Sequence, residues 1–170
     1  MEKDFIQPKL GDDNLVMLSE LRTMPYRDRI RRATVEQLDA HPELSVKPKI
    51  YIASKAAYRP RWREFQDKGY DIVSSWIHTD DRYTDDPTGL DYAKLWQTCE
   101  NDVRKCDVLV IYSQREDHLK GALVELGIAL GLGKEIIACG DLTDKGSWMH
   151  HPRVSISDKS VEDLMIYIYG

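Results

Sequence analysis

Residues 107–133 read DVLVIYSQREDHLKGALVELGIALGLG and include, at 121–132, the most apolar stretch of the chain. The run 107–112 is short, rich in β-branched residues and without alternation of polar and apolar positions, which predicts a strand buried on both faces. The run 120–132 is longer and predicts a helix. A strand, a polar loop and a helix in this order make one unit of an α/β fold.

The same alternation continues on both sides of this unit. We expect strands at 49–53, 71–76, 107–112, 135–139 and 154–156, and helices at 60–68, 90–105, 120–132 and 161–169. The sequence therefore predicts an α/β fold, a three-layer α/β/α sandwich with a five-stranded parallel sheet of the flavodoxin-like or Rossmann-like kind. Because ligands bind outside the carboxyl ends of such strands, a site is expected near the loops that follow residues 53, 76, 112 and 139.

Residues 1–47 differ from the rest in being polar and only weakly periodic. One helix is expected there over 26–40, ended by His41 and Pro42. We interpret 1–47 as a mostly helical N-terminal extension and 48–170 as the α/β domain.

The 170 residues have an ordinary globular composition, with 42% hydrophobic and 31% charged residues and a formal net charge of −5. A general nucleic-acid-binding surface normally has a basic excess, so no extended nucleic-acid surface is expected. No apolar run is long enough to span a membrane. The first residues lack the basic and apolar segments of a signal peptide, which predicts a cytoplasmic protein without a membrane partner.

The three cysteines, Cys99, Cys106 and Cys139, show neither CxxC spacing nor a spacing with histidine that is typical of zinc sites. His150 and His151 are adjacent but have no third ligand in the pattern. The dinucleotide motif GxGxxG and the Walker sequence are both absent. The sequence therefore predicts no disulfide framework, no metal site and no cofactor.

Glu125 is the unusual residue of the expected helix 120–132, because every neighbour from Gly121 to Leu132 is apolar or glycine. A buried carboxylate without a partner costs several kcal/mol. Gly121 lies four residues earlier on the same face and leaves space above the carboxylate. Two interpretations stay open: Glu125 is an acid, base or nucleophile at the floor of a cleft, or it pairs with Lys or Arg at a helix edge.

Several further residues are candidates for ligand contacts. Four cations lie close to the end of the first expected strand: Lys55, Arg59, Arg61 and Arg63. They form either a phosphate-binding set or a solvated helix face. Asp117 and His118 precede the helix 120–132. They either supply a proton or contact phosphate, or they belong to an exposed polar loop, which is the commoner case.

Three tryptophans lie at the ends of expected elements: Trp62, Trp76 and Trp96. An indole at such a place either stacks on a base or packs into the core, and the second use is the commoner one.

Several stretches resemble the nucleoside 2-deoxyribosyltransferase-like family. They are CDVLVIY (106–112), LKGALVELGIALGLGKEIIACG (119–140), IYIASKAAYRPRWREFQDKGYDIVSSWI (50–77), HHPRV (150–154) and SVEDLM (160–165). The resemblance covers residues 48–170. Within the family the chain is most similar to a subgroup associated with phages and bacteria.

The resemblance implies cleavage or exchange at the N-glycosidic bond of a nucleoside or nucleotide, with Glu125 as the nucleophile. It implies a homodimer or higher homo-oligomer, which the N-terminal extension would serve. The residues that we predict to contact the substrate are Tyr51, Ser54, Lys55, Ser75, Trp76, Asp102, Asp117, His118 and Gly121.

The chain departs from the family pattern at two positions. Cys99 stands where the family usually has Asp, and Leu119 stands where it often has Asp or Ser. These departures favour a second hypothesis, a catalytically silent module that binds or senses a nucleotide. A third is NAD glycohydrolysis, because Toll/interleukin-receptor-like domains share this fold and also place a glutamate on a helix.

Overall fold

A computed structural model describes residues 16–24, 26–79 and 89–169. The chain divides into two compact units, Met1–Val46 and Lys47–Gly170. Residues 80–88, in the loop expected to follow residue 76, lie outside the described residues.

The smaller unit is helical, with α1 (Leu18–Thr23), α2 (Tyr26–Arg32), α3 (Val35–Ala40) and the 3₁₀ turn η2 (Pro42–Ser45). The prediction of one helix over 26–40 is wrong, because Thr34 begins a new helix. Its hydroxyl accepts the Gln37 N–H at 3.1 Å, and the Gln37 side chain accepts the Thr34 N–H at 2.9 Å. This capping box satisfies backbone donors that a continuous helix would have paired internally.

The larger unit is built on a parallel sheet. Its strands are β1 (Ile50–Ala53), β2 (Val108–Ser113), β3 (Glu135–Gly140) and β4 (Val154–Ile156), in the order β1-β2-β3-β4. Every residue of β1 and β2 is buried. The predicted α/β fold with a parallel sheet is therefore confirmed, and the apolar runs without alternation are the strands buried on both faces.

The sheet has four strands and not the five expected, because 71–76 forms a single bridge. Ile72 pairs in parallel with Ile50 on the edge of β1 opposite to β2. Beyond that bridge, side chains take the place of the backbone hydrogen bonds of a strand pair. The Ser74 hydroxyl accepts the Ile52 N–H at 2.6 Å, and the Trp76 indole N–H donates to the Ile52 carbonyl at 2.9 Å. Since these side chains pair both backbone groups of Ile52, the segment does not continue as a strand and forms the 3₁₀ turn η4 (Ser75–His78).

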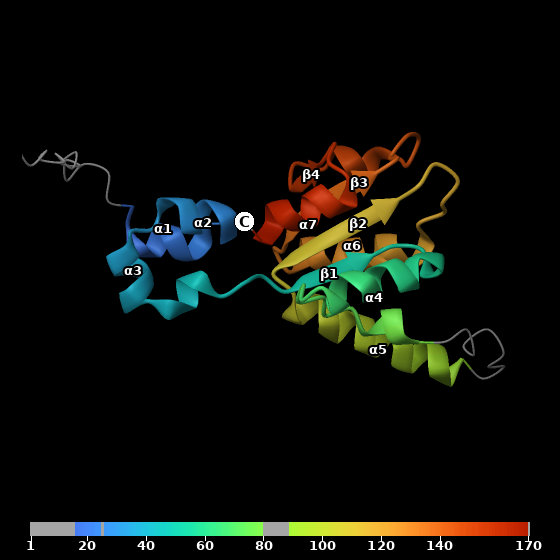
Figure 1. The fold of residues 1–170 in the computed structure, drawn as a ribbon. Coiled ribbons are helices and arrows are strands. Elements are labelled where there is room, and N and C mark those ends of the chain that lie inside the picture. Colours follow the sequence, from blue (N-terminus) through green and yellow to red (C-terminus); the bar gives the residue numbers. More distant parts are fainter. Residues whose placement is uncertain (1–15, 25, 80–88, 170) are drawn as a thin grey trace, which may run out of the picture. The chain divides into compact units, whose positions relative to one another are not determined.

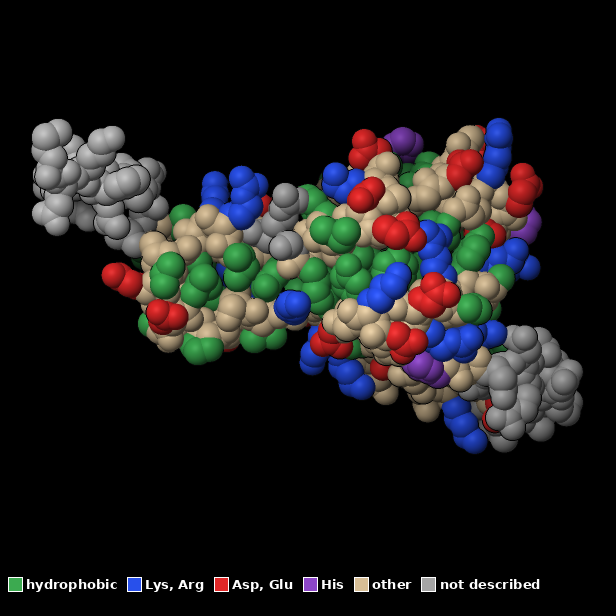
Figure 2. All heavy atoms as spheres, in the orientation of Figure 1, with side chains coloured by type: hydrophobic (Ala, Val, Ile, Leu, Met, Phe, Trp, Pro, Cys, Tyr) green, Lys and Arg blue, Asp and Glu red, His purple; other side chains and the backbone are tan. Residues whose placement is uncertain are grey.

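The helices cover both faces of the sheet (Figure 1). On one face lie α4 (Arg59–Asp67), which follows the short turn η3 (Ala56–Tyr58), and α7 (Val161–Tyr169). On the other lie α5 (Leu90–Lys105) and α6 (Lys120–Gly131), and η6 (Ser147–His150) precedes β4. Acidic and basic side chains are interspersed over the face that α4 and α7 cover (Figure 2).

Successive strand residues point to opposite helix layers, as the pleat requires. Tyr51 of β1 reaches α6, where its hydroxyl meets Glu125. Tyr112 of β2 reaches α4, where its ring packs edge-on against Trp62 with the ring centroids 5.3 Å apart. In the described part of the chain no helix is long and apolar enough to cross a membrane.

Candidate functional site

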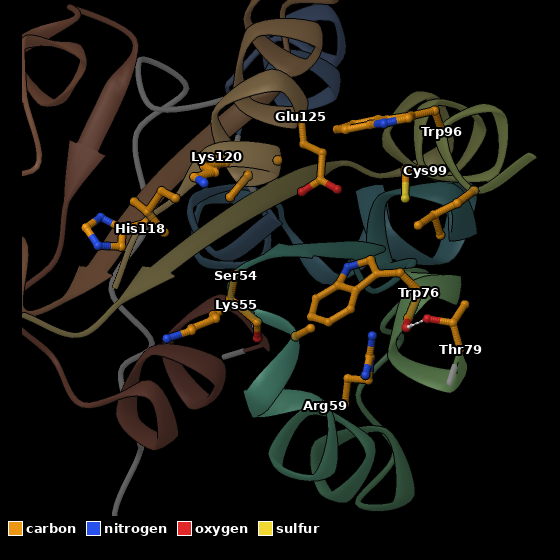
Figure 3. Close-up of a pocket in the computed structure, with 15 residues that line it drawn as sticks. Ser54, Lys55, Arg59, Trp76, Thr79, Trp96, Cys99, His118, Lys120 and Glu125 are labelled. Carbon is orange, nitrogen blue, oxygen red and sulfur yellow. Dashed lines mark hydrogen bonds between the residues drawn. The ribbon is translucent and has the colours of Figure 1, made fainter. Parts of the chain in front are cut away.

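A cavity of about 280 Å³ opens where β1 and β2 end (Figure 3). The chain leaves β1, reaches the bridge at Ile72 on one side of that strand, and then returns to β2 on the other side. The order of the sheet therefore reverses between β1 and β2, and the cavity lies at the place where open α/β sheets bind ligands. Its volume is near the lower end of the roughly 300–1,000 Å³ that is usual for small-molecule sites.

Glu125 of α6 lines this cavity and is only 8% exposed. The buried side of α6 is otherwise apolar, with Ala122, Leu126 and Ala129. Glu125 Oε1 accepts a hydrogen bond of 2.8 Å from the Tyr51 hydroxyl. No Lys or Arg among the described residues forms an ion pair with Glu125, so neutral groups are its partners there.

Burial raises the pKa of Glu125 to about 7, and the Tyr51 hydroxyl and the Cys99 thiol oppose that shift by favouring the ionised form. Burial and the nearby carboxylate raise the pKa of Tyr51, and burial raises the pKa of Cys99 to about 12. Both neighbours are therefore neutral at physiological pH. Glu125 itself is divided between its acid and its carboxylate near pH 7, which suits a proton carrier or a nucleophile.

Gly121 lies one turn before Glu125 and also lines the cavity. The Trp96 indole lies next to Gly121, since a Cβ at Gly121 would be in ordinary van der Waals contact with it, 3.6 Å from Trp96 Cη2. Trp96 comes from α5, and it closes the cavity beside Glu125 (Figure 3). Trp96 therefore borders the space expected above the carboxylate and does not fill it.

Ser54 and Trp76 are both brought to the cavity. The Ser54 hydroxyl accepts the Trp62 indole N–H at 2.8 Å, which ties the end of β1 to α4. Trp76 is held by its own indole hydrogen bond to the Ile52 carbonyl. These bonds hold the wall below Glu125 in place.

Three cations, Lys55, Arg59 and Lys120, line the same cavity, together with His118. Arg61 and Arg63 of the predicted cation set do not line it. Arg61 donates to the Tyr112 hydroxyl and pairs with Glu162, each at 2.9 Å, and Arg63 donates to the Ile77 carbonyl at 3.1 Å.

Four of the predicted contact residues lie outside the cavity lining: Tyr51, Ser75, Asp102 and Asp117. Tyr51 acts behind the lining, through its hydrogen bond to Glu125. Asp102 is buried and accepts the Ser75 N–H at 2.8 Å, which caps the start of η4. Asp117 accepts the Tyr58 hydroxyl and the Gln114 N–H, each at 2.8 Å, and its Oδ1 lies 3.5 Å from Lys55 Nζ. These hydrogen bonds and Lys55 lower the pKa of Asp117 against the effect of burial.

Some lining residues were outside the predicted contact set. They are Ala56, Arg59, Thr79, Leu95, Trp96, Cys99, Leu119, Lys120 and Ala122. The spacing of Leu95, Trp96 and Cys99 places them on one side of a helix, which is a signal that the sequence does contain. The exposed His150 and His151 do not line the cavity, and the described residues contain no group of three potential metal ligands.

No protein-family model matches the chain, and no curated protein matches it either. A solved structure described as the CMP N-glycosidase BcmB of Clostridium botulinum is similar to it. The two are 15% identical, with a TM-score of 0.46, over 70% of this chain and 98% of that chain.

Proposed function

We propose that the protein cleaves the N-glycosidic bond of a nucleoside or nucleotide, with Glu125 as the nucleophile. One observation carries the proposal: the buried Glu125 lines a cavity at the reversal of strand order, and its hydrogen-bond donor is the Tyr51 hydroxyl and not a cation. A cation would hold the carboxylate as a structural ion pair. The resemblance of 48–170 to nucleoside 2-deoxyribosyltransferase-like proteins supports the same chemistry.

The reaction has two displacement steps at the anomeric carbon. In the first, a Glu125 oxygen forms a bond to C1′ while the bond from C1′ to the base nitrogen breaks, and the bonding electron pair leaves with the base. The base takes up a proton from solvent. In the second, water attacks C1′, the glycosyl bond to Glu125 breaks and the carboxylate is restored, while water loses its proton. A second base in place of water gives transfer.

The described residues have distinct roles in this scheme. Tyr51 holds Oε1, so Oε2 is the oxygen that attacks. Ser54 and Trp76 bound the space for the sugar, and Trp96 and Gly121 lie side by side next to it. Lys55 and Lys120 supply positive charge for a phosphate group, and His118 lies beside them.

A catalytically silent nucleotide-binding module is the second candidate. Cys99 and Leu119 are both buried in the cavity lining, at the two positions where the resemblance implies polar groups. A thiol with a pKa of about 12 cannot replace a carboxylate in general acid or base catalysis.

Product analysis tests the proposal. Wild-type protein is incubated with ribonucleosides, 2′-deoxyribonucleosides, their 5′-monophosphates and NAD, each with and without a free acceptor base, and free or exchanged base is measured by chromatography. We expect base release or exchange from at least one compound and a loss of about a thousandfold or more in Glu125→Gln, as for removal of other nucleophiles.

Equal base release by wild type and Glu125→Gln would contradict the role of Glu125. Nicotinamide release as the sole reaction would favour NAD glycohydrolysis. A shift of melting temperature with a nucleotide that is never consumed would favour the silent module.

A further inference from the structure

The cavity is chemically different at its two ends. One end, formed by η4 and α5, presents the aromatic and apolar side chains of Trp76, Leu95, Trp96 and Cys99, and Arg59 lies beside Trp76 (Figure 3). The other end, formed by the loop after β1 and the start of α6, presents Lys55, His118 and Lys120. In Figure 3, Glu125 lies between Trp96 and Cys99 on one side and Lys120 and His118 on the other.

Such a division matches the two ends of a nucleotide. A nucleobase is flat and stacks on aromatic faces, whereas a phosphate needs positive charge. The carboxylate between them stands where a sugar would join the two. Positive side chains occur at both ends, but the indoles of Trp76 and Trp96 line only one of them, so that end favours the base.

The two tryptophans of the apolar end are held differently. Trp76 is 7% exposed, and its indole N–H is used in the bond to Ile52. Trp96 is 38% exposed, and its indole edge rests on Gly121. Trp76 is therefore a structural part of the cavity wall, whereas Trp96 has an accessible indole surface that a ligand can contact. Trp62, in contrast, is fully buried and lies outside the cavity lining.

We propose that Trp96 is a specificity-determining residue on which the base of the substrate stacks, with the sugar at Glu125 and any 5′-phosphate at the end lined by Lys55 and Lys120. The inference rests on the proposed function for the class of ligand. It adds the orientation of that ligand and assigns a contact to a residue outside the predicted contact set. Stacking of a base on one aromatic side chain contributes about 1–3 kcal/mol.

Binding to an inactive parent tests the orientation apart from the reaction. In Glu125→Gln, so that no ligand is consumed, isothermal titration calorimetry is run with AMP, CMP, dAMP and dCMP, the four corresponding nucleosides, ribose 5-phosphate and 2-deoxyribose 5-phosphate. Trp96→Ala should weaken nucleoside and nucleotide binding by about 5- to 150-fold. It should leave the sugar phosphates unchanged, because they have no base.

Two matched variants sharpen the result. Trp96→Phe should keep most of the affinity, since an aromatic face remains. Lys120→Ala should weaken the nucleotides and sugar phosphates and leave the nucleosides unchanged. Melting curves of all variants check that the fold is intact.

The inference is overturned if Trp96→Ala weakens all ligands equally, if it weakens none, or if the parent binds none of them. Failure of the proposed function is a different result, namely tight, Trp96-dependent binding by wild type without release of any base.

Discussion

Tyr51 and Tyr112 are buried tyrosines on neighbouring strands, and their hydroxyl groups lie on opposite faces of the sheet among different partners. On the face covered by α4, the Tyr112 hydroxyl accepts hydrogen bonds from Arg61 at 2.9 Å and from Gln114. On the face covered by α6, the Tyr51 hydroxyl donates to Glu125, which opens onto a cavity. One hydroxyl lies within a cation-paired network, and the other supports a carboxylate that has no ion pair with any residue that the structure describes.

The difference separates a structural polar cluster from a reactive one. Arg61 also pairs with Glu162 at 2.9 Å, which lowers the pKa of that carboxyl together with its own backbone contact. Glu125 shows the reverse shift, because burial is its largest influence and its partners are neutral. A carboxylate is therefore useful for chemistry where the fold buries it and withholds a counter-charge.

The largest expected change in the free energy of unfolding concerns the packed core between α4 and the sheet. Trp62→Ala removes a fully buried indole that contacts Tyr112 and Phe65, so the free energy of unfolding should fall by about 3–5 kcal/mol. Trp96→Ala is the matched control on the α5 side, with an expected loss of at most about 1 kcal/mol. Urea unfolding measures both. Similar losses would show that the two faces do not differ in this way.

The second prediction concerns the pH dependence of stability. The pKa of Glu125 is about 7 in the folded protein against an ordinary value of 4.5. Between these values the folded state keeps a proton that the unfolded state releases. The contribution of Glu125 to the free energy of unfolding is therefore full below about pH 4.5 and is lost as the pH rises through about 7. The loss should reach roughly 3 kcal/mol.

Glu125→Gln isolates this contribution from the other titrating groups. The difference in unfolding free energy between wild type and Glu125→Gln should vary with pH over that window. A difference that stays constant from acid to neutral pH would contradict the raised pKa.

The third prediction concerns the hydrogen bond of Tyr51. In Tyr51→Phe the carboxylate loses a donor that favours its ionised form. A hydrogen bond to a charged group contributes about 1.5–3 kcal/mol, so the pKa of Glu125 should rise by about one to two units above 7. NMR titration with ¹³C-labelled glutamate measures it, and an unchanged midpoint would show that Tyr51 does not set the pKa.

The smallest effect is expected for Tyr112→Phe. It removes one acceptor for Arg61, whose other partner Glu162 remains. The free energy of unfolding should fall by about 1 kcal/mol, and the Glu125 titration should not move. A shift of that titration would show coupling between the two faces of the sheet.

Local patterns were sufficient for most of the elements. The expected helices 90–105 and 161–169 and the strand 154–156 are confirmed with the same bounds, because period and flanking residues define them. The strand 71–76 was wrong for a tertiary reason: Ser74 and Trp76 satisfy the backbone of Ile52, which is distant in sequence. A local pattern does not contain that partner.

The candidate site shows the same limit. Glu125 stood out because a carboxylate in an apolar helix is rare, and the structure places it in the cavity. Asp102 and Asp117 carried no comparable signal, and only the distant partners Ser75, Tyr58 and Lys55 reveal that they hold loops in place. Trp62, Trp76 and Trp96 looked alike in sequence, yet one is core, one is framework and one is a partly exposed wall.

The sequence by itself determined the α/β class, the bounds of most elements and the unusual position of Glu125, because hydrophobic periodicity and an isolated charge are local properties. Tertiary structure alone decided the number of strands, the side chains that share the cavity and the pKa of Glu125. Hydrogen-bond partners and burial depend on residues that are far apart along the chain, and they exist only once the sheet and its helices have packed.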